Sequence, residues 1–159
     1  KGSSCLELGP GSGVMTKRLS DVFDRLVVVE GSRDLLEEIP DGPNIEKCCS
    51  LFESFEPQEK FDSIVIEHVL EHVEDPVGLL TAAKKWLAED GMVYVGVPNA
   101  NSIHKQVAVK MGLLERVDQL NQRDVDFGHR RVYQRSTFTA DIDASGLNVL
   151  EFKGVFLSG

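Results

Sequence analysis

The stretch that decides the fold is Cys5-Leu6-Glu7-Leu8-Gly9-Pro10-Gly11-Ser12-Gly13, followed by Val14-Met15-Thr16-Lys17-Arg18-Leu19. It begins as a short apolar strand that contains a carboxylate, continues as a glycine turn and then opens an amphipathic helix. Glycines at alternate positions let the backbone adopt positive φ angles and come close to a ligand. A helix that begins just after the turn directs unpaired N–H groups and the positive end of its dipole into the same space. The stretch therefore predicts a binding site for a nucleotide-like ligand.

Two common phosphate-binding patterns do not fit this turn. A dinucleotide-binding turn has the pattern Gly-x-Gly-x-x-Gly, and its third glycine would fall on Val14 counting from Gly9 or on Thr16 counting from Gly11. The Walker pattern fails because no Gly-Lys-Ser/Thr follows. What distinguishes the turn is Glu7, two residues before the first glycine. A negative charge there suits a ligand that carries an ammonium group and repels a pyrophosphate.

Four segments of the chain, in this order, resemble the class I S-adenosylmethionine-dependent methyltransferases of the type that acts on small molecules. They are the glycine turn, the strand Val27-Val28-Val29-Glu30, the run from Phe61 to Val73 and the run from Asp90 to Asn99. The resemblance covers nearly the whole chain. It implies an α/β fold with a doubly wound, mostly parallel Rossmann-like sheet and helices on both faces. It also implies S-adenosyl-L-methionine as cofactor and S-adenosyl-L-homocysteine as product.

The alternation of apolar runs and helical patterns predicts a parallel sheet covered on both faces. The family that the chain resembles has seven strands, the last of them antiparallel, whereas this sequence predicts six. The expected strands are residues 6–8, 26–29, 45–49, 63–66, 92–97 and 147–157. The expected helices are residues 14–23, 32–39, 76 to the Asp90-Gly91 turn, 103–114 and 136–146, with a lid or solvated helix over 115–126.

The size and charge of the chain narrow its organisation and its partners. A length of 159 residues suits one domain with a real core, and we predict one S-adenosylmethionine-binding methyltransferase domain over 1–159. A lid or acceptor-site insertion is expected at about 100–132. The formal net charge of −9 argues against binding to a phosphate backbone. We therefore expect a small-molecule acceptor and no nucleic-acid partner, and the sequence leaves a homodimer open.

The hydrophobic runs and the cysteines of the sequence indicate the compartment that we expect. No apolar run approaches the ~20 residues that a membrane helix needs, and no signal-peptide pattern is visible, so no membrane partner is expected. The cysteines are Cys5, Cys48 and Cys49, an odd set without Cys-x-x-Cys spacing. This pattern indicates neither a disulfide framework nor a zinc site. We expect small apolar fillers on buried strands and a reducing, cytoplasmic setting.

The cofactor site is expected at the carboxyl ends of the strands, where ligands bind in open parallel sheets. Glu30 ends the second strand, where a carboxylate can accept hydrogen bonds from both ribose hydroxyls, although an exposed turn glutamate is the alternative. Leu51 and Phe52 follow the third strand and form an apolar slot for adenine, while core filling is an equal reading of Phe52. The resemblance places Glu67 and His68 near the methionine part of the cofactor. The predicted cofactor-binding residues are Glu7, Gly9, Pro10, Gly11, Gly13, Glu30, Gly31, Leu51, Phe52, Glu67 and His68.

The string His68-x-x-Glu71-His72 also matches the inverted zinc-protease pattern His-x-x-Glu-His. Two histidines four residues apart share a helix face and could hold zinc, with Glu71 as base. The context disfavours this reading, because the string follows a strand, Asp75-Pro76 leaves little room for a helix, and a third ligand must come from elsewhere. We therefore predict no metal.

The acceptor side of the site is expected after the fifth strand. Pro98-Asn99-Ala100-Asn101 can offer amide groups to an acceptor, and His104 and His129 fall in the variable region that caps such sites. The run from His129 to Tyr133 is a basic patch in an acidic chain, with a solvated turn or a bridge to surface acids as the alternative. A hydroxyl acceptor needs a base, and a neutral histidine is the natural choice. The candidates are His72 and His129.

The leading interpretation is methyl transfer from S-adenosylmethionine to an oxygen, nitrogen or carbon nucleophile of a small molecule. The sulfonium already activates the methyl group, so the protein mainly has to align the reacting atoms. A nicotinamide-dependent dehydrogenase is the first alternative, and the missing third glycine and the extra Glu7 count against it. The second is a nucleotide-binding module without turnover, which the lid-like 100–132 segment disfavours.

Overall fold

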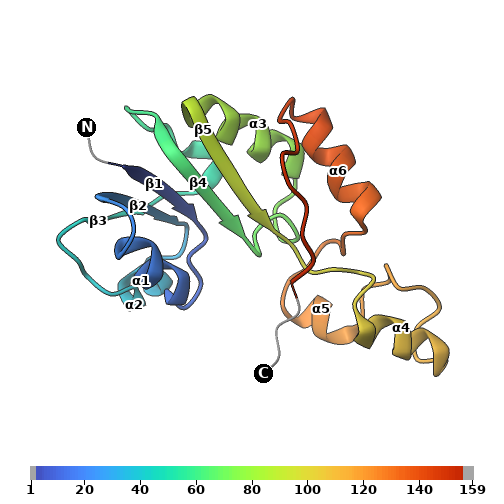
Figure 1. Cartoon of the computed structure of the whole chain (residues 1–159). Coiled ribbons are helices and arrows are strands. Elements are labelled where there is room, and N and C mark those ends of the chain that lie inside the picture. The colour runs from blue at the N-terminus through green and yellow to red at the C-terminus, as the bar shows by residue number, and fades with distance from the viewer. Residues whose placement is uncertain (1–2, 156–159) are drawn as a thin grey trace. The chain divides into compact units, whose positions relative to one another are not determined.

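The computed structural model describes residues 3–155, and strands and helices alternate along most of it (Figure 1). The strands are β1 (Ser4–Leu8), β2 (Arg25–Glu30), β3 (Ile45–Cys49), β4 (Phe61–Glu67) and β5 (Leu87–Gly96). The helices are α1 (Val14–Ser20), α2 (Arg33–Glu38), the short 3₁₀ helix η1 (Phe52–Ser54), α3 (Pro76–Trp86), α4 (Ile103–Lys110), α5 (Gln122–Asp126) and α6 (Arg135–Ala144). The predicted α/β fold class is confirmed.

The sheet has five strands in the order β3-β2-β1-β4-β5, and every described pair is parallel. The chain runs from β1 outward to β2 and β3, then returns to the other side of β1 for β4 and β5. The order therefore reverses at β1, the place where open α/β sheets bind their ligands. Glu7 of β1 lies opposite Val28 of β2 and Val65 of β4. This register places Glu7 and the following turn at the reversal point.

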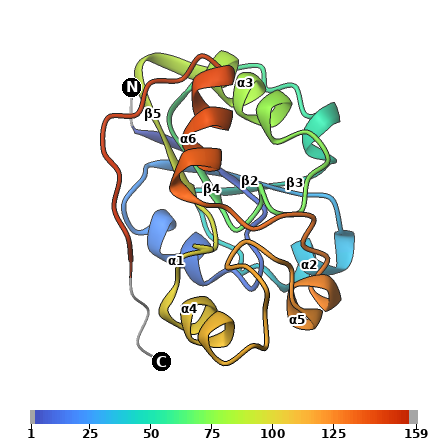
Figure 2. The ribbon, with the colours of Figure 1, turned by 90° about the vertical axis from the view of Figure 1, so that its right-hand side faces the viewer.

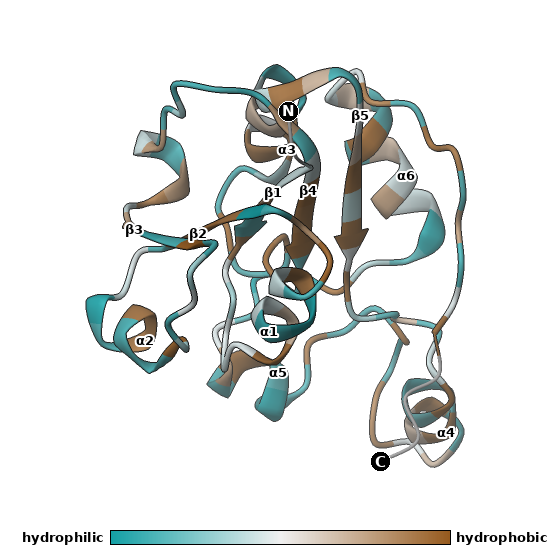
Figure 3. Cartoon of the chain, turned by 60° about the vertical axis from the view of Figure 1, so that its left-hand side comes forward, coloured by the Kyte–Doolittle hydropathy of each residue, from teal (hydrophilic) through white to brown (hydrophobic). Residues whose placement is uncertain are grey.

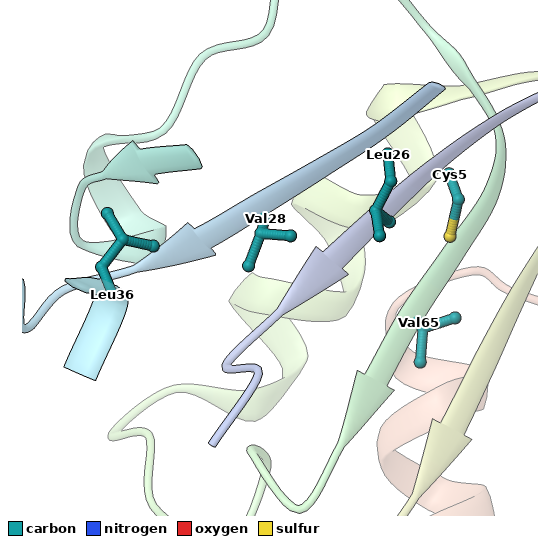
Figure 4. Packing of buried hydrophobic residues seen from close by; sticks show 5 residues of the cluster. All are labelled: Cys5, Leu26, Val28, Leu36 and Val65. Atoms are coloured by element: carbon teal, nitrogen blue, oxygen red, sulfur yellow. The ribbon is translucent and has the colours of Figure 1, made fainter. Parts of the chain in front are cut away.

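The central strands are buried on both faces, as continuous apolar runs in parallel sheets require. One face carries Cys5, Leu26, Val28 and Val65, which pack with Leu36 of α2 (Figure 4). Three side chains of the 14–23 segment, Met15, Leu19 and Phe23, pack against the same cluster. Figure 3 shows the hydropathy that drives this burial, with β4 apolar over most of its length. Because residues two apart in a strand share a face, Glu7 points to the same side as Cys5.

The packing of the chain separates it into two compact units. Unit 1 comprises Lys1–Leu70 and Ala82–Gly96, and unit 2 comprises Glu71–Thr81 and Val97–Gly159. Unit 1 holds the sheet and the glycine turn. The prediction of one domain with an insertion at about 100–132 stays a prediction.

Unit 2 is held together by its own polar and aromatic contacts. The backbone N–H of Ala100 donates to the carbonyl of Tyr133 at 2.8 Å, and the Tyr133 hydroxyl donates to Asp141 of α6 at 2.9 Å. Helices α4 and α5 lie beside each other (Figure 2), joined by Lys105 Nζ and Asp124 Oδ2 at 2.6 Å. These contacts give the 97–155 part a fixed local structure.

Several element boundaries differ from those expected, most of all at α1, β5, α4 and α5. The first helix ends at Ser20 rather than Phe23, because the Asn44 side chain caps its end by donating to the carbonyls of Ser20 and Phe23 at 2.8 Å each. Strand β5 begins at Leu87, ahead of the expected Asp90-Gly91 turn. The register between β4 and β5 shifts between Phe61 and Ser63, and the extra residues lie on β5, between Leu87 and Met92. Helix α4 stops at Lys110 instead of Leu114, and α5 covers only Gln122–Asp126.

The expected sixth strand over 147–157 is wrong for residues 147–155, which adopt no regular structure, and its last two residues lie outside the described part. Leu150 and Val155 are about four-fifths exposed there. Apolar and β-branched composition favours a strand only where a neighbouring strand and a packed face are present. Composition alone therefore gave a false strand.

The cysteines differ from the expectation in part. Cys5 is buried, and burial raises the pKa of its thiol to about 12. Cys48 is half-buried and Cys49 is exposed, because β3 is the end strand of the described sheet. Among residues 3–155, no helix has the length and hydropathy to cross a membrane.

Candidate functional site

The glycine turn after β1 adopts the backbone conformation that its sequence requires. Gly9, Gly11 and Gly13 have φ angles of 65°, 54° and 75°. All three lie in the left-handed region that side chains disfavour. The turn is closed by hydrogen bonds from Gly9 N to Val29 O and from Gly13 N to Pro10 O, both 3.0 Å long. Helix α1 begins directly after Gly13, so its first N–H groups adjoin the turn.

The surroundings of the three glycines differ. A Cβ on Gly9 would stand 2.7 Å from Val69 Cγ2, and one on Gly13 would stand 3.1 Å from Ile39 Cδ1. A Cβ on Gly11 would meet nothing within 4 Å. Gly9 and Gly13 are thus packed against the protein, while Gly11 faces open space. This is the arrangement expected of a cradle that brings backbone close to a ligand.

Glu7 is a buried carboxylate beside this cradle. Its side chain is 2% exposed, and its Oε2 makes no hydrogen bond within the described residues. Burial raises the pKa of Glu7; the nearby Thr16 hydroxyl opposes the rise, although the two groups do not meet hydrogen-bond geometry. The charge of Glu67 raises the pKa of Glu7 further. A buried, partly unsatisfied carboxylate is costly on its own, so a cationic group would relieve it.

The end of β4 adds a second carboxylate and a constrained backbone. Glu67 is exposed at the end of the strand, and its side chain lies against Gly96 of β5. His68 follows with φ 54°, the one non-glycine residue with positive φ among the described residues. Its N–H donates to Gly96 O at 3.0 Å. Strained backbone of this kind often marks a functional turn. Glu7 and Glu67 together make this edge of the sheet favourable for a positive charge.

The ends of β2 and β3 carry the groups predicted for ribose and adenine. Ser32 N donates to Glu30 Oε1 at 2.9 Å, which orients the Glu30 carboxylate. Leu51 is 65% exposed, and a Cβ on Gly31 would stand 3.1 Å from Leu51 Cδ2. The ring of Phe52 approaches Gly9, at 3.6 Å from the same virtual Cβ. The structure thus brings the predicted adenine slot next to the glycine turn.

The histidines of unit 2 form a cluster with one carboxylate. Glu71, His72 and His129 each offer a ligand atom, and these atoms lie within 4.8 Å of one another. The rings of His72 and His129 are edge to face, with centroids 4.8 Å apart. Glu71 is fully buried, His129 is half-buried and His72 is exposed. Asp124 Oδ1 lies 3.6 Å from His129 Nδ1. The sequence did not indicate Asp124, because nothing in its local pattern points to His129.

The basic patch has a structural role in this cluster. Arg130 N donates to Glu71 O at 2.8 Å, and Arg130 Nε donates to His72 O at 2.9 Å. Arg131 Nη1 donates to Val73 O at 2.6 Å. These bonds fix the 129–131 backbone against residues 71–73. Arg130 also forms an ion pair with the exposed Glu74 at 3.0 Å, which is the bridge to a surface acid expected as the alternative.

The remaining acceptor-side residues are placed apart from this cluster or are used in turns. The Asn99 side chain accepts from Asn101 N at 2.8 Å, and His104 is exposed on α4. The zinc reading of the His68–His72 string required a helix, and the structure has turns and bends between Glu67 and Pro76 instead. That helical site is therefore ruled out.

The parallel order with its reversal at β1, and the glycine cradle beside it, define a doubly wound α/β nucleotide-binding fold. The model of a family described as "Methyltransferase domain" matches residues 1–151. The chain belongs to this family. The predicted class, a class I methyltransferase, is confirmed, and the methyl donor of that class is S-adenosylmethionine.

Comparisons with individual proteins give low sequence identity or cover only part of the chain. The chain is 35% identical over 72 residues to ribosomal RNA small subunit methyltransferase A of Mannheimia succiniciproducens. The aligned region covers 45% of this chain and 25% of that protein. It thus spans about a quarter of that curated relative. A chain in the complex between the Haloferax volcanii Trm112 methyltransferase activator and a methyltransferase superposes with a TM-score of 0.72 at 16% identity, covering 95% of this chain and 64% of that one.

The N-methyltransferase NodS of Bradyrhizobium japonicum, solved with S-adenosyl-L-homocysteine, superposes with a TM-score of 0.64 at 19% identity. The match covers 89% of this chain and 64% of NodS. Likenesses at these identities establish the fold.

Proposed function

We propose that this chain binds S-adenosylmethionine in unit 1 and transfers its methyl group to an oxygen, nitrogen or carbon nucleophile of a small molecule. The observation that carries the proposal is the buried Glu7 with an unpaired oxygen beside the open Gly11. A ligand with an ammonium group satisfies the carboxylate, and its methionine part fits along backbone that has no Cβ in the way. Glu67 adds negative charge on the same side.

The other predicted cofactor residues have separate roles in the proposal. The ammonium group of the ligand lies near Glu7, and the ribose hydroxyls donate to Glu30. Gly31, Leu51 and Phe52 hold the adenine ring, and Pro10 shapes the turn with the three glycines. His68 fixes the end of β4 beside the methionine part. The resident cofactor supplies the methyl group; these residues bind and orient it.

The acceptor is proposed to be a small molecule on grounds of charge. A net charge of −9 disfavours a polyanion such as RNA. For a hydroxyl acceptor, we propose that deprotonation depends on His72 and His129, which lie together in unit 2. An amine acceptor that is already neutral needs no such step.

The first test is calorimetric titration with S-adenosylhomocysteine and NAD in parallel. We expect 1:1 binding of S-adenosylhomocysteine and none of NAD, because the turn lacks the third glycine of the dinucleotide pattern. Glu30→Ala should abolish binding, while Glu37→Ala, an exposed carboxylate on α2, should leave it unchanged. Binding of NAD alone would overturn the proposal.

The second test concerns turnover and acceptor class. The chain is incubated with methyl-labelled S-adenosylmethionine and either a metabolite library or ribosomal RNA fragments. Acceptors are ranked beforehand by thermal shift in the presence of S-adenosylhomocysteine, since a true ligand raises apparent stability. Label in a small-molecule product is the expected result. Label in RNA alone would refute the small-molecule proposal.

A further inference from the structure

The cluster of Glu71, His72 and His129 combines residue types that bind divalent metals. Two imidazoles and one carboxylate form the three-ligand set of catalytic zinc sites, in which a fourth position stays open for water or substrate. The three ligand atoms lie within 4.8 Å of one another. Zinc bonds of about 2.0–2.2 Å place tetrahedral ligands about 3.5 Å apart. The side chains therefore have to close by about 1 Å, and the exposed His72 has room to do so.

The backbone around the cluster is already fixed. Arg130 N holds the carbonyl of Glu71, and the Arg130 guanidinium bonds the carbonyl of His72 and the carboxylate of Glu74. The ligands thus come from two segments that the structure has locked together. A site whose supporting bonds are in place before the ion arrives binds it with little reorganisation. The positive charge of Arg130 is matched by Glu74.

An outer carboxylate completes the arrangement. Histidine ligands commonly direct their second ring nitrogen to a carboxylate, which orients the ring and raises its basicity. Asp124 Oδ1 lies 3.6 Å from His129 Nδ1, which makes no hydrogen bond within the described residues. A small shift of the ring would let Nδ1 donate to Asp124 and would leave Nε2 of His129 for an ion. Asp124 is itself anchored by Lys105 Nζ at 2.6 Å and by Asn121 N at 2.9 Å.

We propose that Glu71, His72 and His129 form a binding site for a divalent transition-metal cation, with Zn²⁺ as the preferred ion. Imidazole ligands favour zinc over magnesium, which prefers oxygen ligands. Resting on the methyl transfer proposed above, a bound cation would lower the pKa of an acceptor hydroxyl that takes its open position, and the hydroxyl proton would leave to solvent water. In the metal-bound state the two imidazoles act as ligands instead of proton acceptors.

The test uses the untagged chain, stripped with a chelator that is then removed, and needs neither methyl donor nor acceptor. Zn²⁺ is titrated against a chromophoric chelator, and Co²⁺ is added in parallel to read the ligand field by visible absorption. We expect one ion per chain and a cobalt spectrum typical of nitrogen and oxygen ligands. A large excess of Mg²⁺ should leave the zinc affinity unchanged. A failure here leaves S-adenosylhomocysteine binding untouched, so the two proposals fail separately.

Variants assign the ligands. His72→Ala and His129→Ala should each weaken zinc binding by at least about 10- to 100-fold, the range seen even for loss of an outer-shell partner. Glu71→Gln tests the carboxylate with little change of volume, and circular dichroism checks that each variant is folded. His104→Ala is the matched control, since this histidine is exposed on α4. The proposal is overturned if the unmodified chain binds no zinc, if both cluster variants bind it normally, or if Mg²⁺ competes.

Discussion

The sharpest prediction concerns Glu7→Gln, which removes a charge and changes little else. The side chain is 2% exposed, and its Oε2 makes no hydrogen bond within the described residues. Glutamine keeps the size of the side chain, so packing against Thr16 and β4 is preserved. The substitution therefore separates what the charge does for ligand binding from what it costs the fold.

Binding of S-adenosylhomocysteine should weaken. A hydrogen bond between an ammonium group and a carboxylate contributes about 1.5–3 kcal/mol. Since about 1.4 kcal/mol corresponds to a tenfold change in affinity, the dissociation constant should rise about 10- to 150-fold. The control is Glu37→Gln on α2, which removes an exposed carboxylate and should change nothing.

In the absence of ligand, Glu7→Gln should not lower the free energy of unfolding and is expected to raise it as pH increases. Burial, together with the charge of Glu67, raises the pKa of Glu7 above its ordinary value of 4.5. A group whose folded pKa is raised contributes stability below its unfolded pKa and loses it as pH rises through the folded pKa. The unmodified chain should therefore lose stability relative to Glu7→Gln as pH rises above 4.5. At pH 7 the variant should be equally stable or more stable.

The assay pairs calorimetry with urea unfolding across pH. Titration gives the affinity for S-adenosylhomocysteine, and unfolding of the ligand-free chain gives the free energy at each pH. The reasoning fails if Glu7→Gln binds as tightly as the unmodified chain. It also fails if the variant is clearly less stable at pH 7, because the carboxylate would then have a favourable partner within the fold.

Two further predictions concern the packing at Gly9 and the hydrogen bond of Tyr133. Gly9→Ala should destabilise the chain by roughly 2–4 kcal/mol, since it adds a Cβ 2.7 Å from Val69 Cγ2 at φ 65°. Gly112→Ala, at φ 71° with nothing within 4 Å, should cost only about 1–2 kcal/mol in the same urea measurements; equal costs would argue against the clash. Tyr133→Phe removes the donor to Asp141 at 2.9 Å and should lower the free energy of unfolding by about 1 kcal/mol, with a lower thermal midpoint as the readout. An unchanged midpoint would show that this bond contributes nothing.

Parts of the fold were predictable from the local sequence pattern. The boundaries of β3 matched the expected strand, and Ser32 caps α2 as its position suggests, accepting from Leu35 N. The end of α1 was not predictable, because Asn44, far along the chain, supplies the bonds that cap it. The expected strand is wrong over 147–155 for a related reason: composition reports propensity, while a strand requires a neighbouring strand to pair with.

The glycine cradle of unit 1 and the histidine cluster of unit 2 differ in the same way in how far the sequence predicts them. The cradle is encoded in nine consecutive residues, Cys5 to Gly13, so its conformation followed from the sequence. The histidine cluster depends on Arg130 meeting the carbonyl of His72, a contact between residues 58 positions apart. No spacing rule pairs His72 with His129 across that interval. The zinc-protease string contains Glu71 and His72, two members of this cluster, but the pattern requires a helix there and the structure has turns instead.

Cation binding accounts for a costly buried carboxylate, Glu7, at the reversal point of the sheet. In a strand whose neighbours are apolar, a carboxylate with an unsatisfied oxygen lowers stability, and an apolar residue would pack better against α1. The cost becomes useful once a cation binds, because the same desolvation strengthens its attraction to the carboxylate. Gly11, in the turn that follows Glu7, has open space where a side chain would stand. The carboxylate of Glu7 thus lowers the stability of the ligand-free fold and strengthens ligand binding. Glu7→Gln is therefore expected to weaken binding of S-adenosylhomocysteine and to leave the ligand-free chain equally stable or more stable.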